Sequence, residues 1–203
     1  MSPPLLIEKG RRRLVRALIV MFQGVRIAFY RVISCGHTEG TPSLLQPLLL
    51  AGEGKILIDG HVRIGYFPSP LFFSTYCHLE ARGDCAFISI GDGTYINNGF
   101  SAIAEHTSIT IGKRVLIGTG VEILDSDFHG LNVSDRAKSL PDWAKPVVIE
   151  DDVFIGNNVR ILKGVTIGRG SVIGNSAIVV NDIPQDVVAV GHPARVIRTI
   201  LSR

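Results

Sequence analysis

The chain has 203 residues, of which 46% are hydrophobic and 19% are charged, as expected for one globular domain rather than a disordered protein. The net charge is only +3, so charge alone gives no reason to expect a nucleic-acid partner. The three cysteines are odd in number and lack metal or redox spacing, which favours reduced thiols in a cytoplasmic protein.

Residues 1–40 are predicted to form a basic helical segment. Between residues 5 and 33, apolar side chains recur at helical spacing among several arginines. A spanning helix is not expected, because Arg16, Arg26 and Arg31 interrupt the window of about 20 apolar residues that a bilayer requires. Two interpretations stay open. The helix either caps the first coil or packs on a neighbouring subunit, or it lies on the inner face of an anionic membrane as a peripheral contact.

Residues 41–200 carry a six-residue repeat. Residues 41–47 are expected to be a connector, and the repeat begins irregularly before it becomes regular. In the clearest run, an aliphatic residue occupies every sixth position: Ile149, Ile155, Ile161, Ile167, Ile173 and Val179. Neither the helical period of about 3.6 nor the strand period of two predicts this spacing. The pattern predicts an all-β solenoid, a parallel β-helix of hexapeptide repeats in which the aliphatic residues of successive coils stack inward.

One segment interrupts the repeat. Residues 126–146 are polar and free of the six-residue pattern, so they are predicted to leave the solenoid as an inserted loop. Long loops in compact domains are usually functional or disordered.

Four segments resemble the hexapeptide-repeat acyltransferase family, most closely the branch that O-acetylates sugars, antibiotics and surface polysaccharides. The segments are Asp-Ser-Asp-Phe-His at 125–129, Val-Phe-Ile-Gly-Asn-Asn at 153–158, Ile-Leu-Lys-Gly-Val-Thr-Ile-Gly at 161–168 and Val-Gly-His-Pro-Ala-Arg-Val-Ile at 190–197. The resemblance covers roughly residues 54–200. It implies a left-handed β-helix, a homotrimer with active sites between neighbouring subunits, and acetyl-CoA as the acetyl donor. No pair of histidines has close ligand spacing, so no metal is expected.

His129 is the candidate general base. Acetyl transfer to a hydroxyl needs a group that removes the hydroxyl proton during attack, and histidine titrates near neutrality. His129 stands at the start of the inserted loop, after Asp125 and Asp127, and the resemblance implies that this position holds the base. Asp127 either orients the imidazole or binds the acceptor. The resemblance also implies Asn98, one coil earlier, as an acceptor ligand, and Asp125 is the second acceptor candidate.

The donor site is expected along the last coils. Small corner residues permit close approach of a pantetheine arm, and arginines suit the CoA phosphates, although a plain solvated role for the arginines stays open. Phe154 stands where the family commonly has Trp, and Asn175 and Asn181 stand where it commonly has Ala and Lys. The predicted donor-binding residues are Phe154, Gly156, Asn157, Gly174, Asn175, Asn181, Arg195 and Arg198.

The function expected from the sequence is therefore acetyl-CoA-dependent O-acetylation of a carbohydrate hydroxyl, in a surface-glycan precursor. Two alternatives stay open: N-acetylation of an antibiotic or amino sugar, and a non-catalytic β-helix that serves as scaffold or binding module.

Overall fold

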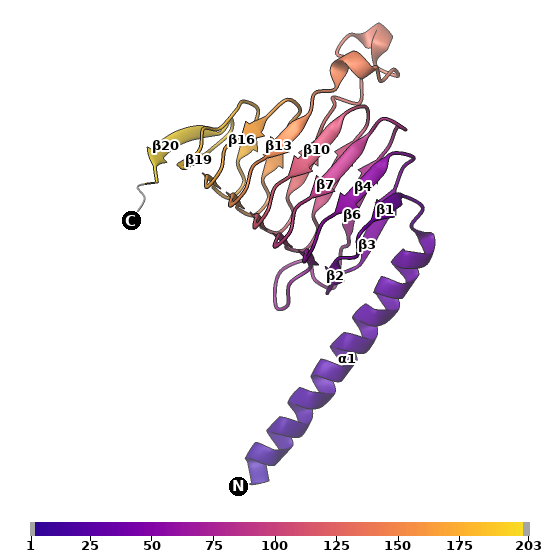
Figure 1. The fold of residues 1–203 in the computed structure, drawn as a ribbon. Helices are drawn as coiled ribbons and strands as arrows, with labels where there is room; N and C mark the ends of the chain where they lie inside the picture. Colours follow the sequence, from indigo (N-terminus) through magenta and orange to yellow (C-terminus); the bar gives the residue numbers. More distant parts are fainter. Residues whose placement is uncertain (1–2, 201–203) are drawn as a thin grey trace.

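The computed structural model describes residues 3–200 and consists of a triangular β-helix preceded by one long helix (Figure 1). Each strand pairs in parallel with the strands three places before and after it, so strands β1–β18 make six turns of three strands. The strands therefore form three walls, which we call sheets A, B and C.

Sheet A contains β1 (His37–Glu39), β4 (Lys55–Ile58), β7 (Phe87–Ile90), β10 (Ser108–Ile111), β13 (Val147–Ile149) and β16 (Thr166–Ile167). Sheet B contains β2 (Ser43–Leu44), β5 (Arg63–Ile64), β8 (Tyr95–Ile96), β11 (Leu116–Ile117), β14 (Phe154–Ile155), β17 (Val172–Ile173), β19 (Val187–Val190) and β20 (Arg195–Thr199). Sheet C contains β3 (Leu48–Ala51), β6 (Cys77–Ala81), β9 (Ser101–Ala104), β12 (Glu122–Leu124), β15 (Arg160–Ile161) and β18 (Ile178–Val179).

The core is a column of stacked aliphatic side chains inside the three walls. Ile111, Ile149 and Ile167 are direct partners on successive strands, and each is at most 1% exposed. Because the coils stack in register, equivalent positions of the repeat meet and bury one another. The six-residue period thus follows from the geometry of one wall and one corner per repeat, and the predicted all-β fold is confirmed.

The solenoid begins earlier than the repeat suggested. The connector expected at residues 41–47 contains β2, and β1, β2 and β3 together form a complete first coil that starts at His37. The irregular stretch that follows is a loop between β5 and β6, residues 65–76, which bulges from the prism and contacts the helix.

Helix α1 (Pro3–Ile33) is 31 residues long and lies within the helical segment predicted at residues 1–40. Its C-terminal half is fixed to the loop at residues 65–76: Nε2 of the buried Gln23 donates to the carbonyl of Phe72 at 2.7 Å, and Arg26 donates to that of Thr75. Its N-terminal end extends away from the solenoid (Figure 1). Within residues 3–200, the structure contains no helix with a stretch long and apolar enough to cross a bilayer.

At its C-terminal end the solenoid is closed by a different pairing. Strand β20 runs antiparallel to β19, and this edge hairpin ends sheet B. An antiparallel strand at this place covers the open edge that a further parallel coil would otherwise extend.

Candidate functional site

The candidate site lies on the loop between β12 and β13. Residues 125–146 leave the prism at the corner between sheets C and A and carry two short 3₁₀ helices, η1 (Val133–Asp135) and η2 (Pro141–Trp143). In Figure 1 this loop projects above the walls, in orange. His129 lies near its start and is exposed. It borders an open groove of about 440 Å³ together with Leu124, Asp127, Arg136 and Leu162.

A single hydrogen bond orients the imidazole. Nδ1 of His129 lies 2.8 Å from the carbonyl oxygen of Arg136, seven residues further along the same loop. A carbonyl can only accept, so Nδ1 must carry the proton. In the neutral ring this leaves Nε2 with a free lone pair, which is the form that a general base needs.

The backbone around His129 is unusual for local reasons. Phe128 adopts a left-handed φ of 59°, and its N–H donates to Ser126 Oγ. Gly130 is buried against η1, where a Cβ atom would meet Asp135 at 2.6 Å. The guanidinium of Arg82 lies 5.0 Å above the ring of Phe128. These contacts turn the chain sharply on both sides of His129 and fix its direction.

Asp127 does not orient His129. Its carboxylate forms an ion pair with Lys163, whose Nζ also donates to the carbonyl of Trp143 at 2.6 Å. Lys163 follows β15, one coil further along, so it ties both the root of the loop and η2 to the prism. Among the described residues, the partner of the imidazole is a backbone carbonyl rather than a carboxylate.

We expect Lys163→Met to loosen the loop and to lower kcat/KM for the reaction proposed below by roughly ten- to hundredfold, because small displacements of a catalytic group are costly. Limited proteolysis within residues 126–146 should become faster, and Lys163→Arg should restore most of the activity. Lys113→Met removes an exposed lysine elsewhere and serves as the matched control. Unchanged proteolysis and activity in Lys163→Met would show that the ion pair does not hold the loop.

The position of Asp125 differs from that of an acceptor ligand. Asp125 is fully buried, and its carboxylate accepts hydrogen bonds from the backbone N–H groups of Glu105, His106 and Thr107 at 2.8 to 3.2 Å. These hydrogen bonds join the end of β12, where Asp125 lies, to the corner that follows β9. This geometry does not support the predicted contact between Asp125 and an acceptor.

The side chain of Asn98 also forms its hydrogen bonds within the chain. It is fully buried, and its side-chain amide donates to the carbonyls of Tyr66 and Pro70 while its oxygen accepts from the N–H of Tyr66. Both N–H donors are thus used to hold the loop at residues 65–76. Asn98 therefore has a structural role in holding this loop. Its hydrogen bonds do not support the predicted contact with an acceptor.

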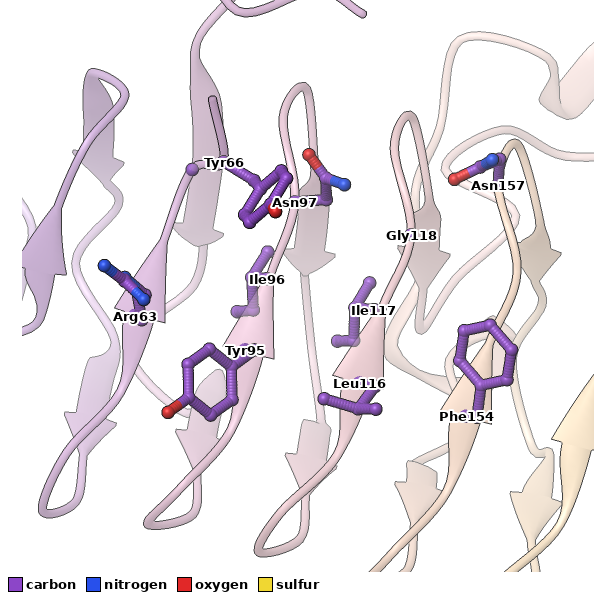
Figure 2. A pocket seen from close by; sticks show the side chains of 11 residues that line it. Arg63, Tyr66, Tyr95, Ile96, Asn97, Leu116, Ile117, Gly118, Phe154 and Asn157 are labelled. Atoms are coloured by element: carbon purple, nitrogen blue, oxygen red, sulfur yellow. The ribbon is translucent and has the colours of Figure 1, made fainter. Parts of the chain in front are cut away.

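The predicted donor residues begin on the outer face of sheet B. Phe154 lies in a row of half-exposed side chains with Tyr95 and Leu116, on the neighbouring strands β8, β11 and β14 (Figure 2). Asn97 and Asn157 lie at the turns that follow two of these strands, and together these side chains line a shallow groove of about 250 Å³. The groove offers an apolar floor with amide groups at one edge.

The corner after sheet B has a ladder of asparagine side chains. Asn175 Oδ1 accepts from the N–H of Asn157, whose own Oδ1 accepts from the N–H of Thr119. Gly156 is buried at this corner, where a Cβ atom would lie 2.5 Å from Asn175 Oδ1. The two asparagines therefore carry a structural role through their oxygens, while their exposed position leaves the amide nitrogens near solvent.

The remaining predicted donor residues lie further along the solenoid. Gly174 is half-buried after β17, and Asn181 is exposed after β18. Arg195 and Arg198 are exposed on β20, the edge strand of sheet B. Both arginines are available to an anion arriving from solvent.

One chain does not bring these two regions together. The groove beside His129 lies at the corner between sheets C and A, whereas the row containing Phe154 lies on sheet B, the wall opposite that corner. Within residues 3–200, the candidate base and the predicted donor groove therefore lie on different sides of the prism.

The roles of two residues of the site could not be read from the sequence. Arg136 acts through its backbone carbonyl, which leaves no constraint on its side chain. Lys163 and Asp127 are 36 positions apart in the sequence, and they are brought together because successive coils stack on one another.

Comparisons with known proteins agree with this architecture. Residues 146–181 match the family model for bacterial transferase hexapeptide (six repeats). Galactoside O-acetyltransferase of Escherichia coli strain K12 is 42% identical over 116 residues, which cover 57% of this chain and 56% of that protein. Polysialic acid O-acetyltransferase of Escherichia coli O1:K1 / APEC is 38% identical over 111 residues, which cover 55% of this chain and 36% of that protein. The chain thus spans about half, or less, of the length of these curated relatives.

A solved structure extends the match to nearly the whole chain. It is a hexapeptide-repeat-containing acetyltransferase of Vibrio cholerae O1 biovar eltor in complex with acetyl coenzyme A, with a TM-score of 0.53 and 28% identity, covering 96% of this chain and 89% of that one. The fold and the repeat define a left-handed parallel β-helix of hexapeptide repeats. In its repeat, its fold and the matching segments of its relatives, the chain is similar to the hexapeptide-repeat acyltransferases.

Proposed function

We propose that the chain is an acetyl-CoA-dependent O-acetyltransferase that acts on a hydroxyl of a carbohydrate, in a surface-glycan precursor. The observation that carries this proposal is the hydrogen bond from Nδ1 of His129 to the carbonyl of Arg136, beside an open groove. It leaves Nε2 as a free base at a place where a sugar can enter. The two relatives named for O-acetylation of galactosides and polysialic acid support a carbohydrate acceptor.

In the proposed reaction, Nε2 of His129 takes the proton of the acceptor hydroxyl as its oxygen attacks the thioester carbonyl. The tetrahedral intermediate then collapses, the carbon–sulfur bond breaks, and the CoA thiolate leaves and takes up the proton from the imidazolium. The carbonyl of Arg136 stabilises the imidazolium through Nδ1–H, the role that a carboxylate has in a catalytic triad. No acetyl-enzyme is needed, and the buried Cys77, whose pKa burial raises to about 12, is unsuited to form one.

We place the donor on sheet B of a neighbouring copy, in a homotrimer. The row containing Phe154 supplies an apolar surface for the pantetheine arm, and Gly156, Asn157, Gly174 and Asn175 line the adjoining corner. Arg195 and Arg198 are the candidates for the CoA phosphates, because a guanidinium pairs with phosphate in a bidentate manner. The complex of the Vibrio cholerae structure with acetyl coenzyme A supports this donor.

We also infer a cytoplasmic location. Cys35, Cys77 and Cys85 are all free thiols, and the donor is a cytoplasmic metabolite. Among the described residues, none of the three is arranged to form a disulfide with another.

The proposal is tested by incubating the protein with labelled acetyl-CoA and a panel of neutral sugars, oligosaccharides and amino sugars. We expect release of free CoA with label that is removed from the sugar by mild alkali, as an ester is. Alkali-stable label on amino sugars alone would instead establish N-acetylation. Failure to bind CoA by calorimetry would favour a scaffold or binding module.

A further inference from the structure

Helix α1 attaches to the solenoid through its more polar face. Gln23, Arg26 and Tyr30, at spacings of three and four, contact the loop at residues 65–76. The ring of Phe22, beside this polar face, lies 6.1 Å from that of Phe73 in the same loop. Gln23 is 4% exposed, and the ring of Tyr30 lies 4.7 Å from that of Tyr76. These contacts fix the rotation of the helix about its own axis.

The opposite face is apolar and has no partner among residues 3–200. Side chains there recur every three or four positions along the helix, and each is between 49% and 84% exposed. We call them the apolar stripe: Leu14, Leu18, Met21, Val25, Phe29 and Val32. A helix of a globular protein normally turns such a stripe toward its own core, so its outward direction indicates a surface that something else covers.

The charge on the same helix is almost entirely positive. Lys9, Arg11, Arg12, Arg13 and Arg16 follow one another in the N-terminal half, which extends beyond the solenoid (Figure 1). The single acidic residue, Glu8, is paired with Arg12. An apolar stripe next to a cluster of arginines and lysine is the pattern of a helix that lies in the interface of an anionic bilayer.

We propose that helix α1 binds the surface of an anionic membrane, with the apolar stripe in the acyl boundary and the basic residues among the headgroups. A second copy of the chain fits the stripe less well. Identical helices packed in parallel along it would bring Arg11 of each copy together on the shared face, and the helix has no acidic residue at a position to neutralise them. This inference does not depend on the proposed acetyl transfer.

The test uses the full chain and sedimentation with vesicles. Wild type should bind vesicles of phosphatidylcholine with about one-third phosphatidylserine at least tenfold more tightly than vesicles of phosphatidylcholine alone, and the difference should shrink as salt rises. Leu18→Glu with Val25→Glu should abolish binding, because both side chains lie in the stripe. Val196→Glu with Ile197→Glu adds the same charge at two exposed apolar residues of β20 and should leave binding unchanged.

Circular dichroism and gel filtration establish that both double variants fold. Should Leu18→Glu with Val25→Glu not fold, replacement of Arg11, Arg12 and Arg13 by Gln provides a second variant, which should lose the preference for anionic vesicles. Absence of wild-type binding, or equal binding to both lipid compositions, would overturn the proposal. Dissociation of the assembly by the stripe variant, without any vesicle binding by wild type, would instead assign the stripe to a second copy.

Discussion

Replacement of His129 by Ala is expected to reduce kcat for acetyl transfer by about 10²- to 10⁴-fold, the range usually contributed by a positioned general acid–base group. CoA binding, measured by calorimetry, should remain close to that of wild type, because the ring lies at the corner between sheets C and A, away from the predicted donor groove on sheet B. The measurement is CoA thiol release at saturating donor with the best carbohydrate of the panel.

The matched control for this prediction is His61→Ala. The side chain of His61 is 99% exposed on a coil corner. His61→Ala therefore removes a histidine from the chain while the candidate base His129 stays in place. Equal turnover in wild type and His129→Ala would remove His129 from the mechanism. A parallel fall in kcat for His61→Ala would show that the effect is not specific to the loop.

Asp125→Ala is expected to lower the free energy of unfolding by about 3–5 kcal/mol, because it leaves three backbone N–H groups without their charged acceptor in a fully buried corner. For a chain of this length that corresponds to a fall in Tm of roughly 6–20 °C. Calorimetry or urea unfolding provides the measurement. Asp125→Asn keeps one acceptor oxygen and should fall between wild type and Asp125→Ala.

This prediction also separates the two roles considered for Asp125. Asp142→Ala removes an exposed carboxylate of η2 and should change stability little, which makes it the matched control. If Asp125→Ala unfolded like wild type but raised KM for the carbohydrate, the carboxylate would be an acceptor ligand after all, and the structural role derived from its three hydrogen bonds would be wrong.

The fold was predictable because its signal is local and repeated. An aliphatic residue at every sixth position, as at Ile149, Ile155 and Ile161, indicates one wall and one corner of a coil. This pattern can be recognised in the sequence even though the distant contacts are not known. The first coil was missed for the same reason: β2 (Ser43–Leu44) lacks the Ile-Gly pattern and lies between prolines. The direction of the apolar stripe on α1 likewise depends on Gln23 and Arg26, whose partners are nearly fifty residues away.

The candidate site was only partly predictable. The inserted loop and the place of His129 at its start follow from a break in the repeat. The polar residues beside it could not be assigned, because a buried amide or carboxylate looks the same in the sequence whether it binds a substrate or the backbone. Asn98 and Asp125 were expected at the acceptor, yet Asn98 holds the loop at residues 65–76 and Asp125 holds the corner after β9. Only the three-dimensional partners of their oxygens and nitrogens separate the two roles.

The proposed mechanism requires that His129 of one copy acts on a thioester bound to sheet B of another. Mixing subunits measures this directly. His129→Ala and a donor-groove variant, Phe154→Arg with Leu116→Arg, are each purified, unfolded together and reassembled, and CoA release is compared with that of each variant reassembled alone. The account predicts that the mixture regains a substantial part of wild-type turnover, because some interfaces then pair an intact loop with an intact groove. A mixture no more active than its parents, although mass spectrometry shows mixed assemblies, would contradict it.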